Sequence, residues 1–430
     1  MKIVRFVENV VCGFKKSAGG ATITFESLRD YVISQAQLDR ILPDENVRNR
    51  LYKISNLDPR LQPFNAKFQK SGRLLFYNGS GGYGDQIVSW PVAKWLADQG
   101  MEVHILTDPG NQTCWYNFPW VKTINFTPLA YELFKMFDHH FMMEQVNNAD
   151  EHPDQLHPVD AMFSRMGIDW RSIPPEAKNV RPVYTWAELQ AKHNFPDRPK
   201  IGLFQLSSAN PVRCLPPNDT AFLLSKIADA FTDTHWVALY DEFVAKEYVS
   251  ALNCKTCNGT GNVPNPEAAK TEAPPEAAKT EAPPEAKPEA KPEVPPVDAT
   301  VVCPDCRGWK YICQNIQPWI CPSLRDLWSF TNERASVVVA SDSLMVHVAG
   351  CQGVPCVGLW GPVASLNRTQ YYKNHVPVWK REVCPHAPCF SYTSTFPRYC
   401  PPRGSARVVC EVLAAIMPAE VIAAISKVRR

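Results

Sequence analysis

The chain has 430 residues and a formal net charge of +2, so there is no electrostatic case for non-specific nucleic-acid binding. No apolar run reaches the roughly 18 residues that a membrane-spanning helix needs, and residues 1–6 lack the apolar core of a signal peptide. The 15 cysteines are an odd number and several form CxxC pairs, which favours a reducing, cytoplasmic compartment over a secreted disulfide framework. A chain of this length is expected to form about two to three domains.

Residues 1–71 are predicted to be a helical N-terminal extension. The segment from Thr24 through Ile33 to Leu42 fits one helix, and Pro43 begins a second that ends near Ile54. Nothing in this segment suggests chemistry, so we interpret it as an accessory helical module.

A different pattern begins at Gly72. A strand over 73–77, a glycine-rich turn over 78–85, a helix over 86–97 and a strand over 100–107 predict a βαβ unit with a right-handed crossover. The glycines of the turn would let the backbone approach a ligand at the helix N-terminus. Their spacing is not that of a dinucleotide fingerprint, and the P-loop lysine is absent. Asp85 ends the turn, and two interpretations stay open, a helix cap and a functional carboxylate.

A second α/β half opens at Lys200. It combines a strand over 201–206, a helix over 218–231 and a strand over 235–240. In the loop after the first strand, the hydroxyls of Ser207 and Ser208 and the guanidinium of Arg213 suit a phosphate, although a solvated loop with one surface arginine would also fit.

Histidines between the two halves invite a metal interpretation. They lie at His139, His140, His152 and His157. Their spacing fits no metal motif, so solvated surface histidines are expected.

Two cysteine motifs mark an insertion over residues 252–311. Each is a CxxC pair followed by a glycine, and together they supply four thiolates, the tetrahedral set of a structural zinc: Cys254, Cys257, Cys303 and Cys306. They resemble the zinc-binding knuckles of DnaJ-type chaperones, a resemblance that covers only these two short segments and implies a metal clip. Between them, residues 264–298 are rich in Pro, Glu, Ala and Lys and have no apolar face to bury, which predicts a disordered linker.

The stretch 337–362 predicts a ligand site. Its order is an apolar strand, Asp342 or Ser343 at the N-cap position, a short helix carrying His347, and a second strand that ends at Gly361 and Pro362. In open α/β sheets, ligands bind at the carboxyl ends of the strands.

The C-terminal part combines a looser cysteine cluster with helices. The cluster suits either metal or packed free thiols and consists of Cys384, Cys389, Cys400 and Cys410. Residues 406–428 read as helical, with a break or restart at Pro418.

The stretch around Asp342, His347 and Pro362 resembles the D-[ST]-G-x-x-H-x-A…G-x-P…G-P segment of the ADP-heptose:lipopolysaccharide heptosyltransferase family, glycosyltransferase family 9. The resemblance implies an α/β protein of GT-B fold, with two Rossmann-like domains facing a cleft. The acceptor domain would be 72–196, and the donor domain 197–251 with 312–430. Leu344 stands where the family has glycine, and Arg213 where lysine is usual.

The same resemblance implies an inverting transfer of a sugar, without a catalytic metal, from a nucleoside-diphosphate sugar such as an ADP-sugar to a hydroxyl of a glycan or another acceptor. Asp85 would be the catalytic base. The donor would be bound by seven residues: Gly84, Ser207, Ser208, Arg213, Asp342, Ser343 and His347. Two alternatives remain, a non-catalytic nucleotide-sugar-binding or scaffold protein and a nucleotide-sugar epimerase.

Overall fold

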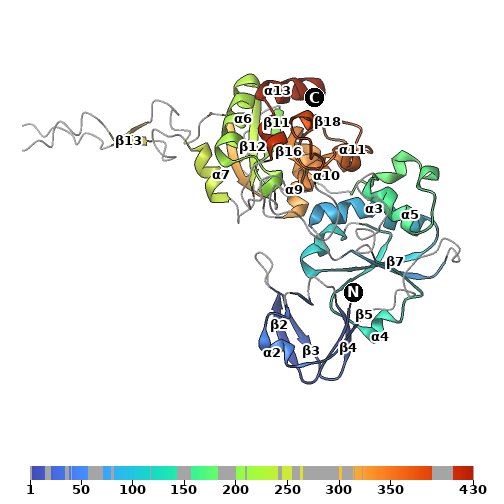
Figure 1. Cartoon of the computed structure of the whole chain (residues 1–430). Coiled ribbons are helices and arrows are strands. Elements are labelled where there is room, and N and C mark those ends of the chain that lie inside the picture. Colours follow the sequence, from blue (N-terminus) through green and yellow to red (C-terminus); the bar gives the residue numbers. More distant parts are fainter. Residues whose placement is uncertain are drawn as a thin grey trace, which may run out of the picture.

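The chain folds into three successive parts, a β-rich N-terminal module and two α/β domains (Figure 1). The computed structural model describes residues 2–14, 21–33, 38–39, 41–56, 71–78, 82–116, 118–142, 156–182, 200–208, 211–240, 245–253, 262–264, 300–302, 313, 315–321, 323–389 and 410–429.

The N-terminal module is a β structure, so the prediction of a helical extension is wrong. Its antiparallel sheet has the order β5-β1-β4-β9, beside a hairpin of β2 and β3. Buried residues alternate along β1, where Val4 and Phe6 face the core, and this period of two belongs to strands. Leu28 has φ 59° and turns the chain in the middle of the segment expected to be helical. The elements are β1 (Lys2–Phe6), β2 (Val10–Phe14), β3 (Ala21–Phe25), β4 (Asp30–Ile33), α2 (Glu45–Arg48) and β5 (Leu51–Asn56).

The module is attached to the first α/β domain by a strand and an apolar cluster. β9 (Leu129–Ala130) pairs with β4 and adds one strand from the domain to the sheet of the module. Beneath this pairing, Val32 of the module packs with Leu75, Tyr77 and Leu106 of the domain. The module is therefore packed on one face of the following sheet.

The first α/β domain contains the predicted βαβ unit. Its parallel sheet has the order β10-β6-β7-β8, and α3 connects β6 to β7. Residues 74–77 of β6 are fully buried, as expected for a parallel strand covered on both faces. The elements are β6 (Arg73–Tyr77), α3 (Tyr83–Asp98), β7 (Glu102–Thr107), η2 (Pro109–Cys114), β8 (Val121–Phe126), α4 (Tyr131–Phe134), β10 (His139–Met142), α5 (Pro158–Arg165), η5 (Trp170–Ser172) and η6 (Pro175–Lys178).

The second α/β domain is built on a six-stranded sheet of order β15-β12-β11-β16-β17-β18, with every neighbouring pair parallel. The predicted strands and the closing helices are confirmed. The strands are β11 (Lys200–Gln205), β12 (Thr234–Tyr240), β15 (Ile316–Ile320), β16 (Ala335–Ser341), β17 (Cys356–Trp360) and β18 (His375–Trp379). The helices are η8 (Pro211–Arg213), α6 (Pro217–Ala230), α7 (Ala245–Leu252), α9 (Leu324–Glu333), α10 (Leu344–Gln352), α11 (Leu366–Thr369), η9 (Arg381–Val383), α12 (Glu411–Ala414) and α13 (Pro418–Val428).

The two α/β domains share one apolar core. Figure 1 shows α3 of the first domain beside α9 and α10 of the second. Trp90 of α3 lies against Trp328 of α9, with ring centroids 5.3 Å apart. Burial of such large aromatic surfaces packs the two α/β domains against one another.

The insertion is described only in part. β13 (Asn262–Pro264) and β14 (Thr300–Val302) form an antiparallel ribbon in which Asn262 pairs with Val302. The four predicted zinc ligands lie outside the described residues, as does nearly all of the predicted linker: Cys254, Cys257, Cys303, Cys306 and residues 265–299. Among the described helices, none is long and apolar enough to cross a membrane.

Candidate functional site

Asp342 lies directly after β16, at the carboxyl edge of the second sheet. It is buried, and Nη1 of Arg213 lies 3.3 Å from its Oδ2. Burial alone would raise the pKa of Asp342, but Arg213 and then Arg368 and His347 outweigh it, so the pKa lies below its ordinary value. Asp342 is therefore a carboxylate that can accept hydrogen bonds in a site with little water.

Ser343 is the N-cap residue of α10, one of the two residues that the sequence allows for this position. Its hydroxyl contacts the side-chain oxygen of Gln205 and lies 2.9 Å from the carbonyl oxygen of Ser341. Ser343 therefore joins the ends of β11 and β16. It does not cap a backbone N–H of α10 with its side chain, which leaves the N-terminal N–H groups of the helix available to a ligand.

His347 and Gly84 meet across the two α/β domains. A Cβ added at Gly84 would lie 3.0 Å from Cδ2 of His347, so the backbone of α3 approaches the imidazole as closely as a glycine allows. Nδ1 of His347 is 2.9 Å from the hydroxyl of Tyr372. Burial lowers the pKa of His347 to about 4, although the Asp342 carboxylate opposes the change. The imidazole is therefore neutral near pH 7.

Asp85 is the third residue of α3, and both interpretations of it have support. Its Oδ2 accepts a hydrogen bond of 2.9 Å from the backbone N–H of Gly82, so it caps the helix. Its charge also interacts with Arg368, Arg213 and Asp342, all in the second domain. Burial raises the pKa of Asp85 above its ordinary value, and Arg368, the Gly82 N–H and Arg213 oppose this rise. Asp85 thus caps α3 and also belongs to the site between the domains.

A buried polar network fixes the turn that carries Asp85. The side-chain amide of Asn78 donates to the backbone oxygen of Asp85 at 3.0 Å and to the hydroxyl of Ser89 at 2.8 Å. Gln86 donates to Asn78 at 3.1 Å and accepts from the indole of Trp115 at 2.9 Å. Because these groups are satisfied by one another, the position of Asp85 is set by the first domain alone.

Ser207 and Ser208 follow β11 and are buried, so the alternative of a solvated loop is wrong for them. The backbone N–H of Ser208 lies 3.0 Å from Sγ of Cys214. Ser208 is 8% exposed, and its hydroxyl has no hydrogen-bond partner among the described residues. A buried hydroxyl without a partner costs free energy that a bound ligand can recover. Residues 209 and 210 lie outside the described residues.

No family model and no curated protein matches the chain, but solved structures share its architecture. Its similarity to ADP-heptose LPS heptosyltransferase II of E. coli has a TM-score of 0.52 at 10% identity, over 83% of this chain and 98% of that chain. Its similarity to TibC, an iron-containing dodecameric glycosyltransferase of enterotoxigenic E. coli, has a TM-score of 0.51 at 12% identity, over 99% and 91% of the two chains. The chain has the GT-B fold.

One charged residue between the two α/β domains was not found from the sequence. Arg368 of α11 is buried, and its charge interacts with Asp342, Asp85 and Arg213. Its only sequence signal is its position, a few residues after the strand that ends at Trp360. The facing carboxyl ends of the two sheets therefore bring together two arginines and two carboxylates.

The histidines before the second domain are not all at the surface. The prediction is wrong for His157, which is buried, with Nε2 3.1 Å from the carbonyl oxygen of Arg368. Burial lowers the pKa of His157 to about 3. His140 is half-buried and stacks on Phe134 with ring centroids 4.0 Å apart. His152 lies outside the described residues.

The C-terminal cysteines differ in burial. Cys410 is buried, Cys384 and Cys389 are half-buried, and Cys400 lies outside the described residues. In the part of the chain that the structure describes, no three His, Cys, Asp or Glu side chains are grouped as metal ligands.

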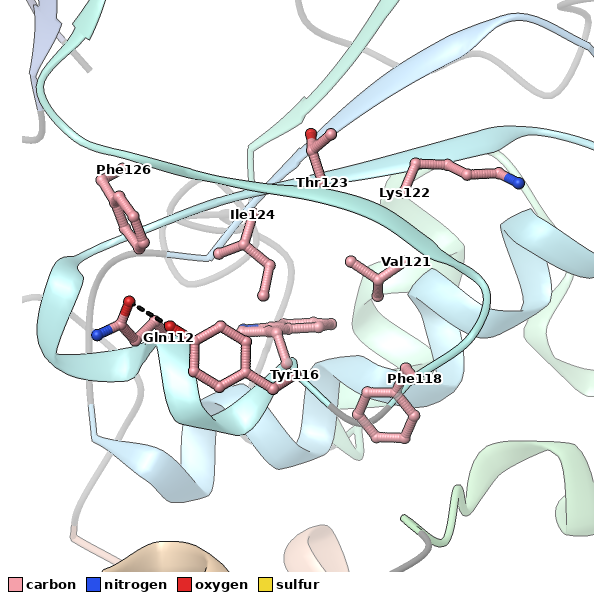
Figure 2. Close-up of a pocket in the computed structure, with 9 residues that line it drawn as sticks. Gln112, Tyr116, Phe118, Val121, Lys122, Thr123, Ile124 and Phe126 are labelled. Atoms are coloured by element: carbon pink, nitrogen blue, oxygen red, sulfur yellow. Dashed lines mark hydrogen bonds between the residues drawn. The ribbon is translucent and has the colours of Figure 1, made fainter.

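A separate groove of about 390 Å³ runs beside β8 in the first domain. Figure 2 shows the rings of Tyr116, Phe118 and Phe126 at this groove, whose polar lining residues include Gln112, Lys122 and Thr123. The hydroxyl of Tyr116 donates to Gln112 at 2.6 Å. None of the predicted site residues lines this groove, so it lies apart from the cleft of Asp85 and Asp342.

Proposed function

We propose that the protein is an inverting glycosyltransferase that moves a sugar from a nucleoside-diphosphate sugar to an acceptor hydroxyl. The observation that carries the proposal is the meeting of charges from both domains. Asp85 of the first domain interacts with Arg213 and Asp342 of the second at the carboxyl ends of two parallel sheets. This is where a GT-B protein has room for a donor on one side and an acceptor on the other.

Asp85 is the proposed base. The acceptor oxygen forms a bond to the anomeric carbon while its proton passes to the Asp85 carboxylate. The bond between that carbon and the diphosphate oxygen breaks, and its electron pair leaves with the diphosphate. The hydrogen bond from the Gly82 N–H to Oδ2, at 2.9 Å, would hold one carboxylate oxygen and orient the other.

The second domain would hold the donor. Arg213, the buried hydroxyl of Ser208 and the N-terminus of α10 at Ser343 would stabilise the negative charge on the leaving diphosphate, beside Ser207. Asp342, with its lowered pKa, would accept hydrogen bonds from sugar hydroxyls.

His347 is proposed to contact the donor as a neutral group. Its pKa of about 4 keeps the imidazole uncharged near pH 7, so it can donate or accept one hydrogen bond without adding positive charge. Gly84 is proposed to give the donor access by keeping side-chain atoms away from this imidazole.

An ADP-sugar is the proposed first choice of donor. This choice is supported by the donor in the name of heptosyltransferase II, ADP-heptose, and by the shared fold. A glycan or another hydroxyl compound would be the acceptor.

The proposal is tested by a donor screen with the purified chain. Released nucleoside diphosphate is measured for ADP-, UDP- and GDP-sugars with and without glycan acceptors. Asp85→Asn should abolish transfer and keep donor binding, whereas Asp98→Asn, in an exposed pair with Lys94 on the same helix, should be neutral. Undiminished turnover by Asp85→Asn would remove Asp85 from the mechanism.

A non-catalytic nucleotide-sugar-binding protein is the second candidate. It is favoured by the capping bond between Asp85 and Gly82, which gives the carboxylate a structural reason to be present. Donor binding without turnover on any acceptor would support it. The epimerase alternative would instead give an isomerised donor with no acceptor present.

We also infer that the insertion binds one structural zinc through four cysteines: Cys254, Cys257, Cys303 and Cys306. The inference is supported by the β13–β14 ribbon, which pairs Asn262 with Val302, the residues next to the two motifs in the sequence. Metal analysis should find about one zinc per chain. The double variant Cys254→Ser, Cys257→Ser should lose it.

A further inference from the structure

Arg368 is a buried cation in a cleft that already holds Arg213. It is 8% exposed and lies on α11, after β17. Its charge interacts with Asp342, Asp85 and Arg213. An arginine is almost never buried unless opposite charge is nearby, so its place among these groups needs an electrostatic reason.

The first domain fixes the turn that bears Arg368. The imidazole of His157 donates to the carbonyl oxygen of Arg368 at 3.1 Å. Two residues further along, Gln370 donates to the Asp160 carboxylate at 3.0 Å, and the hydroxyl of Tyr371 donates to the same group. Arg368 therefore belongs to the second domain but is held from the first, so it is positioned only when the two domains are packed together.

The hydrogen-bond donors beside Asp342 and Asp85 suit an anion. Arg213 and Arg368 repel one another, and they share the two carboxylates of Asp342 and Asp85. His347 is neutral near pH 7, with a pKa of about 4, so it adds no negative or positive charge. Two guanidinium groups, the buried hydroxyl of Ser208 and the N–H groups in the first turn of α10, which the side chain of Ser343 does not cap, suit a diphosphate, whose oxygens accept in pairs.

We propose that Arg368 is a donor-binding residue that binds the diphosphate together with Arg213. The assignment rests on the proposed function and adds a residue outside the resemblance on which that function was built. Because Arg368 is held by the first domain, it would couple diphosphate binding to the closed arrangement of the cleft. The leaving diphosphate would thus be stabilised only when Asp85 stands opposite it.

The test is the affinity for nucleotides that differ in phosphate number, measured by calorimetry without turnover. The probes are the nucleoside diphosphate that the wild type binds best among ADP, UDP and GDP, and the matching nucleoside. Arg368→Met should weaken diphosphate binding by about 10- to 100-fold and leave the nucleoside unchanged. Arg368→Lys should keep part of the affinity, because it retains the charge but not the fork. Arg171→Met is the matched control, since that side chain is 73% exposed.

Each outcome decides one point. If the wild type binds the diphosphate and Arg368→Met binds it as tightly as the control Arg171→Met does, the role of Arg368 is overturned. The proposed function is not affected by that result. A wild-type chain that binds none of the three diphosphates would remove the donor site and this role with it. Should Arg368→Met fail to fold, Arg368→Lys decides: a loss confined to the diphosphate supports the role, and an equal loss for the nucleoside overturns it.

Discussion

The ion pair of Lys178 and Asp160 gives the sharpest stability prediction. Nζ and Oδ1 are 2.7 Å apart, and the two side chains are 3% and 0% exposed. The hydroxyl of Tyr371 and the amide of Gln370, both from the second domain, bind the same carboxylate. The pair therefore supports the first domain and its contact with the second.

Lys178→Met removes one charge and keeps most of the apolar stem. It leaves Asp160 buried without a cation, and breaking a buried pair in this way costs about 3–5 kcal/mol. Asp160→Asn removes the other charge and should also be costly. The double variant leaves no buried charge from the pair, so its loss should be smaller than the sum of the single losses by about 1–3 kcal/mol.

The assay is urea denaturation followed by tryptophan fluorescence, read at the first unfolding transition. Lys94→Met is the matched control, because Lys94 and Asp98 form an exposed pair worth less than about 1 kcal/mol. A loss for Lys178→Met no larger than for the control, or strictly additive losses in the cycle, would refute the electrostatic reasoning.

Three further predictions concern the cleft. Gly84→Ala should lower donor affinity and cost about 1–3 kcal/mol, more than the helix gains from alanine, because its Cβ would lie 3.0 Å from His347. Gly82→Ala is its control in thermal melts, since a Cβ there meets nothing within 4 Å. Ser208→Ala should leave the ligand-free protein as stable as before or more so, while calorimetry finds weaker nucleoside-diphosphate binding; a stability loss would mean the hydroxyl has a structural partner. The third prediction concerns pH. Below pH 6.5 the imidazoles of His157 and His347 become protonated in the unfolded state, whereas in the folded state they stay neutral down to a pKa of about 3 and about 4. The free energy of unfolding should therefore decrease as the pH is lowered from 6.5. The slope is about 1.4 kcal/mol per pH unit for each histidine, and His157→Gln should reduce it in urea titrations at stepped pH.

The two α/β domains could be predicted because their signals are local. β16 and β17 are apolar runs, and α10 between them begins at Ser343 and ends where Gly353 adopts φ 66°. Each of these features is decided by residues that are neighbours in the chain. The same holds for β6 and α3, and this is why the Asp85 turn could be found without a structure.

The N-terminal module was misread for a related reason. Its strands are only four to six residues long, so a helical period and an alternating period cannot be told apart over one strand. β4 pairs on one side with β1 and on the other with β9, which lies nearly a hundred residues later in the chain, and no local sequence pattern indicates this second pairing. Tertiary pairing therefore decided the structure of this segment.

Arg368 was missed because its role depends on packing between domains. Its helix is one turn long, and its neighbours in the sequence carry no motif. Its charged partners Asp85 and Asp342 lie at the ends of different sheets, and they come together only because α3 packs on α9 and α10. A sequence can indicate each edge of a cleft, but the charges that face each other across it follow from the packing of large side chains such as Trp90 and Trp328.

Leu344 lies where α10 of the second domain meets α3 of the first. The family segment that this stretch resembles has a glycine at the position of Leu344. In the structure the side chain of Leu344 packs against the shared core, and its Cα lies 3.9 Å from where a Cβ of Gly84 would be. The glycine at this contact is therefore Gly84 of α3, from the opposite domain. The close contact of α3 with α10 requires a glycine at position 84, because a Cβ there would lie 3.0 Å from His347, while Leu344 contributes apolar contact to the domain interface.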